Sequence, residues 1–521
     1  MTDTSPSVLS LFDVAHSAPV LVVGAGIMGA GIAQVAALAG HPVMLFDLRD
    51  GAADQARAQL ATTLDTLVAK GKLGSDVVAQ AMARIQVITE LTSAAHAHLV
   101  VEAIVEKLEA KRSLFRQLEA VVSADCVLAT NTSSISVTAI ANGLQHPQRL
   151  VGMHFFNPVP LMKLVEVVSG LQTAPAVAEA IFQLSKAWGK TPVHARSTPG
   201  FIVNRIARPY YAETLALLQE QAATPAVLDA CLRAVGFRMG PCELMDLIGH
   251  DTNFSVTQSV YEANFYDKRF VPSLVQRELV DGGLLGRKTG RGFYSYATGA
   301  EKPGLNPLPE ASLPMCQSLT VMGAGPLAER LAKQLSAGLT LLGTSSLPVV
   351  LRQPHSNWVG LEVDGAQLRL TDGRPATTLT AGASAEGDVA VFDLPMADAA
   401  NAPLAWAVSA RASQDWAAAA PQWLRLLGFH PQRLADAPGL VVARTLAMLI
   451  NEAADAVHQG VCSTDGADAA MKLGVNYPAG PFEWLARWDV RAVVHLLNAL
   501  DTHHRGERYR VSPRLLLQAH V

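Results

Sequence analysis

Short apolar runs alternate with longer amphipathic stretches along the first third of the chain. The apolar runs are rich in β-branched residues and end at glycine or at polar residues, as buried strands do. They lie at 20–23, 42–46, 98–103, 126–130 and 150–156. Segments with helical spacing, such as 30–39 and 106–120, separate them. Strands that alternate with helices predict a parallel sheet covered by helices, which is an α/β fold.

One stretch, residues 14–46, contains no Asp, Glu, Lys or Arg and is long enough to suggest a membrane span. Glycines and prolines interrupt it, however, at positions 19, 24, 26, 29, 31, 40 and 42. A strand, a turn, a helix and a second strand explain this pattern better than one lipid-facing helix.

The turn after the first strand has the sequence Gly24-Ala25-Gly26-Ile27-Met28-Gly29. In a Rossmann unit the first glycine permits the tight turn, the second lets the backbone approach a pyrophosphate, and the third lets helix and strand pack closely. Asp47 ends the second strand, where a carboxylate can bind the adenosine ribose and repel a 2′-phosphate. The sequence therefore predicts NAD rather than NADP, although Arg49 slightly weakens that preference. The alternative is a Rossmann unit that has lost its cofactor.

Polar residues follow two later strands, with Asn131-Thr132-Ser133-Ser134 after the run 126–130 and Asn157 after 150–156. Ligands of such sheets sit beyond the carboxyl ends of the strands, so both clusters are expected at the cofactor edge. His154 lies in the second run, and Glu166 follows within another apolar run, where a carboxylate needs a partner. A His–Glu pair suits a general base that removes a hydroxyl proton. A hydrogen-bonded core histidine is the alternative, and spacing alone leaves both open.

Composition narrows the class of protein further. The chain has 521 residues, enough for three or four domains, with 50% hydrophobic and 17% charged residues. The net charge is −4, so no basic field exists to hold a nucleic acid.

Five scattered cysteines without a CxxC pair argue against a metal site or a disulfide framework and fit a reducing compartment. The first Lys or Arg is Arg49, so neither a secretory nor a transit signal is expected, and we expect a cytoplasmic protein without a membrane span.

The second half of the chain repeats part of the first. The segment 438–444 matches 199–205 at an offset of 239, and 480–483 matches 240–243 at an offset of 240. This predicts a duplicated helical domain. Ala443 stands where the first copy has Asn204, so the second copy is expected to be structural or to line a substrate tunnel.

A proline-rich linker leads into the middle of the chain, where the run 319–328 echoes the glycine turn with Ala328 in place of the third glycine and Pro326 inside the turn. The next apolar run, 339–342, ends in Gly343-Thr344 without an acidic residue. We therefore expect a degenerate Rossmann-like unit that binds no cofactor. The predicted organisation is an NAD-binding domain (1–196), a helical domain (197–299), the degenerate unit (300–425) and a second helical copy (426–521).

Taken in order, several motifs resemble those of the NAD-dependent L-3-hydroxyacyl-CoA dehydrogenases. The resemblance runs from about Val20 to Tyr296 and rests on the segments 23–34, 101–106, 131–134, 153–160, 163–167, 198–205 and 286–294. It implies an α/β Rossmann domain followed by an all-α dehydrogenase domain, with NAD as the cofactor and a 3-hydroxyacyl-CoA as the substrate.

The resemblance also implies roles for individual residues. His154 would be the general base, oriented by Glu166, while Ser133 and Asn204 would hydrogen-bond the reacting oxygen. The implied cofactor contacts are Gly24, Gly26, Ile27, Met28, Gly29, Asp47, Glu106, Lys111, Asn131 and Asn157. Lys70 and Lys72 would meet the CoA phosphates, with a solvated surface pair as the alternative. Turn capping remains an alternative for Ser133, and a helix-start hydrogen bond for Asn204.

The long two-copy form resembles bacterial enzymes that oxidise 3-hydroxyadipyl-CoA in phenylacetate catabolism. Arg238 is a candidate cation for the distal carboxylate, with a surface arginine as the alternative. A 3-hydroxybutyryl-CoA dehydrogenase, or a general β-oxidation enzyme of fatty acid metabolism, is the alternative. The fused copy could supply within one chain an interface that single-copy members form between subunits. A homodimer and a separate enoyl-CoA hydratase partner stay open. A non-catalytic NAD-binding protein is disfavoured because the full polar set is present.

Overall fold

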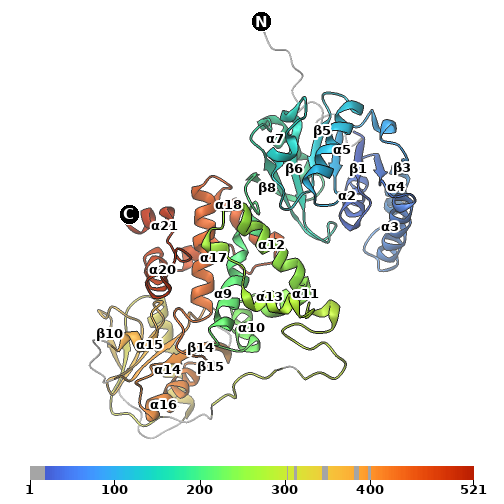
Figure 1. Ribbon diagram of the computed structural model, residues 1–521. Helices are drawn as coiled ribbons and strands as arrows, with labels where there is room; N and C mark the ends of the chain where they lie inside the picture. The colour runs from blue at the N-terminus through green and yellow to red at the C-terminus, as the bar shows by residue number, and fades with distance from the viewer. Residues whose placement is uncertain (1–17, 302, 310–313, 343–349, 381–386, 397–399) are drawn as a thin grey trace. The chain divides into compact units, whose positions relative to one another are not determined.

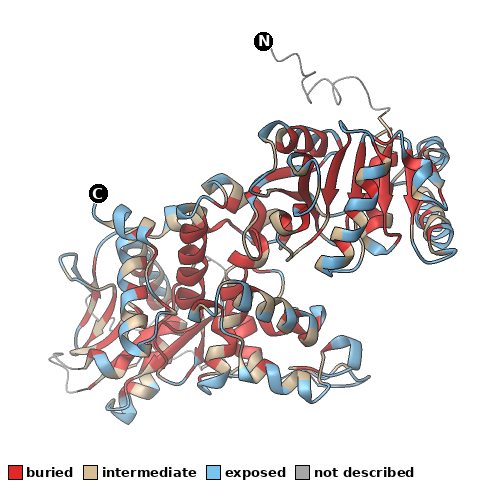
Figure 2. Cartoon of the chain, turned by 45° about the horizontal axis from the view of Figure 1, so that its top comes forward, coloured by how far each residue is buried: buried red, intermediate tan, exposed pale blue. Residues whose placement is uncertain are grey.

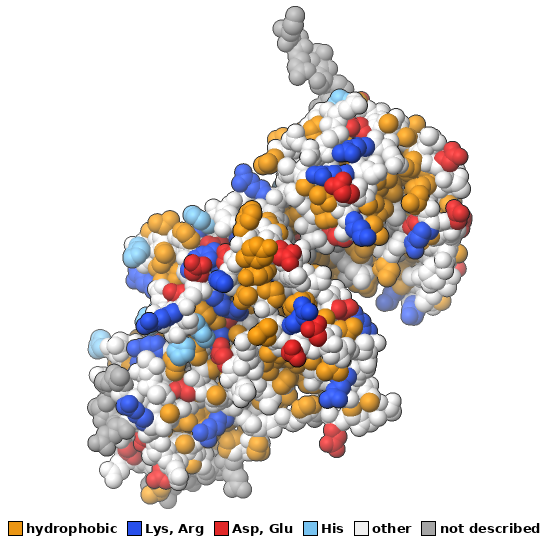
Figure 3. Space-filling model, viewed as in Figure 1, with side chains coloured by type: hydrophobic (Ala, Val, Ile, Leu, Met, Phe, Trp, Pro, Cys, Tyr) orange, Lys and Arg blue, Asp and Glu red, His pale blue; other side chains and the backbone are white. Residues whose placement is uncertain are grey.

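The computed structural model describes residues 18–301, 303–309, 314–342, 350–380, 387–396 and 400–521. The chain forms two compact units (Figure 1): unit one runs to Arg205 and includes Ala456–Val475, and unit two comprises Ile206–Asp455 and Asn476–Val521. The division falls inside α8 (Val203–Ile206) and α17 (Val442–His458). Within the described part of the chain, no helix is long and apolar enough to cross a membrane. On the face seen in Figure 3, acidic and basic side chains are interspersed.

Unit one contains an eight-stranded sheet in the order β3-β2-β1-β4-β5-β6-β7-β8. The strands are β1 (Val20–Val23), β2 (Val43–Phe46), β3 (Ile85–Val87), β4 (Leu99–Glu102), β5 (Val127–Thr130), β6 (Leu150–Phe155), β7 (Leu164–Ser169) and β8 (Thr191–Arg196). All neighbours are parallel except β6 and β7. The expected open parallel sheet is therefore correct only up to β6, because the connection from β6 to β7 is too short for a parallel crossover.

Helices cover both faces of this sheet, which explains why its central strands are buried along their whole length (Figure 2). They are α2 (Ile27–Leu38), α3 (Ala52–Ala69), α4 (Ser75–Arg84), α5 (Leu108–Val121), α6 (Val137–Ala141) and α7 (Pro175–Ala187), with short 3₁₀ turns η1 (Leu91–Ala94) and η2 (Pro147–Arg149). The small residues of α2 let it lie close to its neighbours. A Cβ on Gly31 would come within 2.8 Å of Val159.

Unit two contains a seven-stranded sheet in the order β10-β9-β11-β12-β13-β14-β15, with parallel and antiparallel neighbours mixed. The strands are β9 (Leu319–Met322), β10 (Val350–Gln353), β11 (Gly360–Val363), β12 (Ala366–Leu370), β13 (Val389–Phe392), β14 (Ala402–Val408) and β15 (Phe429–Arg433). The similarity of this unit to the first suggested a strand at 339–342. The structure shows instead that this run is the end of helix α14 (Pro326–Leu342). Gly343 and Thr344 lie outside the described residues.

The remaining helices of unit two belong mainly to the helical copies. They are α9 (Arg208–Gln219), α10 (Pro225–Ala234), α11 (Pro241–Ile248), α12 (His250–Ala263), α13 (Leu274–Asp281), α15 (Ala376–Leu379), α16 (Gln414–Leu426), α19 (Pro481–Arg487), α20 (Val490–His504) and α21 (Pro513–Ala519), with 3₁₀ turns η3 (Lys268–Phe270) and η4 (Arg287–Thr289).

The second helix of each helical copy packs against a β-sheet, and the two copies use different sheets. In unit two, α10 of the first copy packs against β14 of the middle sheet. In unit one, the equivalent helix of the second copy, α18 (Thr464–Gly474), packs against β7 and β8. Residues 456–475 therefore pack against the sheet that carries His154 and Glu166, although the sequence places them in the second helical copy.

Arginine contacts between the two helical copies repeat with the same offset of 239 residues. In unit two, Arg444 binds Glu220 at 3.0 Å, and in unit one Arg205 donates to Gln459, the residue equivalent to Glu220, at 2.9 Å. Two further arginines, Arg269 and Arg508, are also equivalent, and each binds a glutamate of the opposite copy. The paired contacts are typical of a two-fold related interface, here made within one chain.

Candidate active site

The glycine turn after β1 has the shape that a pyrophosphate requires. Gly24 has a φ of +102°, and a Cβ there would come within 2.5 Å of the Ala103 carbonyl oxygen. A Cβ on Gly29 would lie 1.7 Å from the Gly24 carbonyl oxygen. A Cβ on Gly26, by contrast, meets nothing within 4 Å. The backbone is thus open at the second glycine, where α2 begins without a side-chain cap, so its first N–H groups and positive dipole end suit a phosphate. These residues fit the diphosphate of a dinucleotide.

Asp47 follows β2 directly and faces this turn. Its Oδ2 accepts a hydrogen bond from the Ala25 backbone N–H at 2.8 Å, and its Oδ1 accepts from the Arg49 backbone at 3.0 Å and from Arg49 Nε at 3.1 Å. Burial acts to raise the pKa of Asp47, but these hydrogen bonds outweigh it and hold the pKa below its ordinary value. The side chain is therefore an ionised acceptor at the end of β2, where a ribose hydroxyl can donate to it.

Asp47→Ala is expected to weaken NAD binding by about tenfold or more, because it removes a charged hydrogen-bond acceptor. It also releases Arg49 from its ion pair, so the ratio of NADP to NAD affinity is expected to rise. Binding titrations with both cofactors test this, with the exposed neighbour Asp50→Ala as the control. An unchanged affinity ratio in Asp47→Ala would show that Asp47 does not discriminate at the ribose.

Glu106 lies just beyond β4, and its carboxylate binds the loop that follows β5. Its Oε1 accepts hydrogen bonds from Thr132 Oγ1 at 2.6 Å and from the backbone of Ser133 and Ser134 at 3.0 and 3.1 Å. Burial acts to raise the pKa of Glu106, but Lys111 and these donors hold it below its ordinary value. The position of Ser133 is thus set through an ionised carboxylate.

Lys111 lies behind this carboxylate rather than at the surface. It is 1% exposed, and its Nζ contacts Glu102 at 2.6 Å and Glu106 at 3.2 Å. Within this structure Lys111 therefore holds Glu106 in place. Reading the sequence missed Glu102, although a carboxylate in an apolar run is the same signal that drew attention to Glu166.

Asn131 links the ends of β5 and β6, because its Oδ1 accepts a hydrogen bond from the Phe155 backbone N–H at 2.8 Å. Asn157 is exposed just beyond β6, and Ser133 is half-buried on the neighbouring loop. The predicted polar clusters thus lie at the carboxyl ends of adjacent parallel strands.

His154 and Glu166 are directly opposite each other in the β6–β7 antiparallel pair. His154 Nδ1 lies 2.5 Å from Glu166 Oε2, and the two residues are 5% and 0% exposed. The aromatic rings of Phe156 and Phe201 flank the imidazole, at 4.5 and 5.9 Å between ring centroids. Because an ionised carboxylate only accepts, Nδ1 is assigned as the donor and Nε2 carries the lone pair.

The second oxygen of Glu166 holds the start of α8. Glu166 Oε1 accepts hydrogen bonds from the backbone N–H groups of Ile202 at 3.0 Å and Val203 at 2.9 Å. Asn204 is the next residue and is half-buried. One carboxylate therefore fixes both the imidazole and the helical turn that carries Asn204.

A segment of the second helical copy packs beside these residues, which reading the sequence missed. Gly474, at the end of α18, comes so close to β7 and α8 that a Cβ there would lie 2.7 Å from Leu164 and 3.0 Å from Val203. Val461 accepts a hydrogen bond from the Arg196 backbone at 2.9 Å. Of the remaining candidates, Lys70 and Lys72 are exposed after α3 in unit one, and Arg238 is exposed in unit two.

A Rossmann sheet with an open glycine turn, an acidic residue after β2 and a buried His–Glu pair defines an NAD-binding oxidoreductase. Family models agree. "3-hydroxyacyl-CoA dehydrogenase, NAD binding domain" matches residues 19–198, and the corresponding C-terminal domain matches 200–296 and again 439–520. "3-hydroxybutyryl-CoA dehydrogenase reduced Rossmann-fold domain" matches 368–438.

Two known proteins match nearly the whole chain, and a third matches its first half. The chain is 42% identical to the 3-hydroxyadipyl-CoA dehydrogenase of Escherichia coli K12 over 94% of its own length and 95% of that protein. A crystal structure described as 3-hydroxybutyryl-CoA dehydrogenase, also from E. coli K12, has a TM-score of 0.84 and 40% identity, covering 96% of this chain and 98% of that one. A probable 3-hydroxybutyryl-CoA dehydrogenase of Deinococcus radiodurans is 41% identical over 53% of this chain and 99% of its own.

The chain therefore belongs to the 3-hydroxyacyl-CoA dehydrogenase family and is an NAD-dependent enzyme that acts on a hydroxyacyl-CoA. The predicted fold class is confirmed, with the Rossmann domain, the duplicated helical domain and the reduced Rossmann domain all recognised. The expectation that the reduced domain binds no cofactor stays a prediction.

Proposed function

We propose that the protein oxidises the 3-hydroxyl group of 3-hydroxyadipyl-CoA to a ketone, with His154 as the general base. The observation that carries the catalytic part is the buried pair of His154 and Glu166, joined at 2.5 Å between Nδ1 and Oε2. A carboxylate in this position fixes one tautomer of the imidazole and stabilises its protonated form. His154 Nε2 is then the atom that takes the hydroxyl proton.

The other polar residues position the substrate. Ser133 and Asn204 carry neutral hydrogen-bonding groups that can hold the oxygen on C3 both as a hydroxyl and as a carbonyl. Glu106 sets the loop of Ser133, and Glu166 sets the helical turn of Asn204. NAD, when bound, accepts the hydride from C3. Lys70 and Lys72 remain proposed contacts for the CoA phosphates.

The choice of 3-hydroxyadipyl-CoA rests on the full-length E. coli relative of that name, which this chain matches through both copies. It would give the enzyme a place in phenylacetate breakdown. The second candidate substrate is 3-hydroxybutyryl-CoA, which is favoured by the names of the full-length solved structure and of the half-length relative.

Initial rates of NADH formation at 340 nm distinguish the two substrates. With NAD, we expect kcat/KM for 3-hydroxyadipyl-CoA to exceed that for 3-hydroxybutyryl-CoA by at least about tenfold, since discrimination by a charged group exceeds that of a few methylenes. A lead for 3-hydroxybutyryl-CoA would replace the substrate and keep the reaction. No turnover of any 3-hydroxyacyl-CoA would reject the proposal.

A further inference from the structure

Lys190 lies directly before β8 in unit one and is a buried cation. The residue is 8% exposed, and its Nζ donates to the backbone carbonyl oxygens of Val159 and of Met162, the latter at 2.9 Å. Among the residues that the structure describes, no carboxylate compensates this charge, and the charged group that acts on it is a second cation, Lys163. Both contacts of the ammonium group are therefore made to one loop, residues 157–163.

The ammonium group of Lys190 keeps its charge at neutral pH although it is buried. Burial lowers its pKa to about 8, and the neighbouring Lys163 acts in the same direction. Below that value the side chain donates as a cation, and a charged donor makes stronger hydrogen bonds to carbonyl oxygens than a neutral one. Without this donor the buried carbonyl group of Val159 would be unsatisfied, so the loop would change its position to reach another donor or water.

The loop 157–163 follows the catalytic strand and packs on the helix that begins at the glycine turn. His154 lies on β6, three residues before the loop starts at Asn157. On the other side, a Cβ on Gly31 of α2 would come within 2.8 Å of Val159. The nicotinamide of a bound dinucleotide has to lie between the diphosphate at the start of α2 and the carbon whose hydroxyl group binds His154. The loop therefore borders the nicotinamide half of the cofactor.

We propose that Lys190 positions this loop, and Asn157 with it, against the nicotinamide half of NAD and so supports hydride transfer. The proposal rests on the proposed function, in which His154 takes the hydroxyl proton. Lys190 is a positioning residue, because it acts through the carbonyl groups of the loop. The backbone N–H of the next residue, Thr191, donates to the Lys163 carbonyl oxygen at 2.8 Å. The start of β8 thus holds the middle and the end of the loop.

The two halves of NAD depend on different parts of unit one. The diphosphate and the adenosine ribose face the glycine turn and Asp47, which belong to β1, α2 and β2. ADP-ribose contains these groups but lacks the nicotinamide. A displaced loop should therefore weaken the binding of NAD and leave the binding of ADP-ribose unchanged. The rate should fall as well, since a small misplacement of reacting groups lowers it steeply.

The test measures the affinities of the full-length protein for NAD and for ADP-ribose by calorimetric titration, together with kcat. Lys190→Met is expected to weaken NAD binding by about tenfold and to lower kcat by about 10- to 100-fold, with less than about a twofold change for ADP-ribose. Lys190→Arg keeps a charged donor and should recover part of both losses. Lys186→Met, at an exposed lysine on α7, is the matched control and should behave as wild type.

The outcomes separate this proposal from the proposed function. Unchanged NAD affinity and kcat in Lys190→Met would overturn the role of Lys190, and so would an equal loss of affinity for NAD and ADP-ribose, which a merely structural lysine would cause. Thermal unfolding shows whether each variant is folded, and Lys190→Arg supplies the same comparison of the two ligands if Lys190→Met is not. A wild-type enzyme that oxidises no 3-hydroxyacyl-CoA would reject the proposed function, whereas the two affinities would still test Lys190.

Discussion

Replacing His154 by alanine is expected to lower kcat by about 10² to 10⁴-fold, the usual contribution of a general base. NAD affinity should be unchanged, because the glycine turn and Asp47 belong to other strands of the sheet. KM should change little, since the proton is transferred in the reaction and not on binding. Steady-state rates of NADH formation and a binding titration with NAD measure both quantities.

A second His–Glu pair provides the matched control. His194 on β8 contacts Glu179 at 3.4 Å, but the side chains are 50% and 44% exposed. His194→Ala should therefore keep full activity. If His154→Ala retained near-normal turnover, or if His194→Ala lost as much, His154 would be a structural histidine and the proposed base would be wrong.

Glu166 is a less direct test of the same chemistry, because it has two roles. Besides His154, it holds the backbone N–H groups at the start of α8. In the second half of the chain, Asp393 has only the role of holding the start of a helix. It accepts hydrogen bonds from the backbone of Val441, Val442 and Ala443, the positions equivalent to 202–204. Burial raises the pKa of Asp393 to about 6 although backbone donors oppose this. A carboxylate at the helix start is thus structural in both copies, and substituting Glu166 would disturb folding and chemistry together.

The central part of the fold could be predicted from the sequence because buried parallel strands leave continuous apolar runs. The strand at 20–23 and its glycine turn were located to the residue, and the fixed offset revealed the duplicated helical domain. The pairing of His154 with Glu166 was foreseen on energetic grounds, since a carboxylate among apolar residues requires a partner. The antiparallel register that places them opposite each other comes from the structure.

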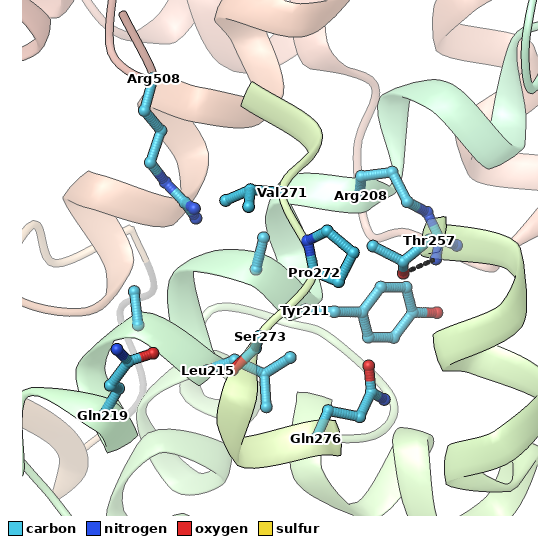
Figure 4. A pocket seen from close by; sticks show the side chains of 12 residues that line it. Arg208, Tyr211, Leu215, Gln219, Thr257, Val271, Pro272, Ser273, Gln276 and Arg508 are labelled. Atoms are coloured by element: carbon cyan, nitrogen blue, oxygen red, sulfur yellow. Dashed lines mark hydrogen bonds between the residues drawn. The ribbon is translucent and has the colours of Figure 1, made fainter. Parts of the chain in front are cut away.

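Features that depend on packing between distant segments could not be predicted. No pattern in 456–475 reveals that this segment of the second copy packs against the sheet of unit one. A small cavity within unit two, beside Arg208 (Figure 4), likewise combines residues from α9, α12 and the C-terminal segment. Arg238, the candidate cation of the sequence, is exposed in the structure. The burial of a single side chain is not visible in the order of residues.

Glu213→Gln is expected to destabilise unit two strongly, by about 3–5 kcal/mol, because it breaks a buried charge network. Glu213 on α9 is 0% exposed and accepts hydrogen bonds from Arg444 at 2.8 Å, Arg508 at 2.8 Å and the Tyr509 hydroxyl at 2.9 Å. These three partners come from the second helical copy, so the network joins the two copies. A neutral amide at this position would leave the positive charges of Arg444 and Arg508 without the negative charge of Glu213. The expected decrease in the melting temperature is about 5 to 15 °C.

The same network predicts how stability depends on pH. Burial acts to raise the pKa of Glu213, but Arg508 and Arg444 outweigh it and hold the pKa below the ordinary 4.5. The folded pKa is thus the lower one, so the contribution of Glu213 is complete above pH 4.5 and is lost as the pH falls through the folded value. Glu213→Gln should therefore flatten the acid side of the stability curve. Asp267→Asn, which breaks a partly exposed ion pair with Arg510, is the control and should cost less than about 1 kcal/mol. Equal melting temperatures for Glu213→Gln and wild type at about pH 7 would show that the network does not stabilise the contact between the copies.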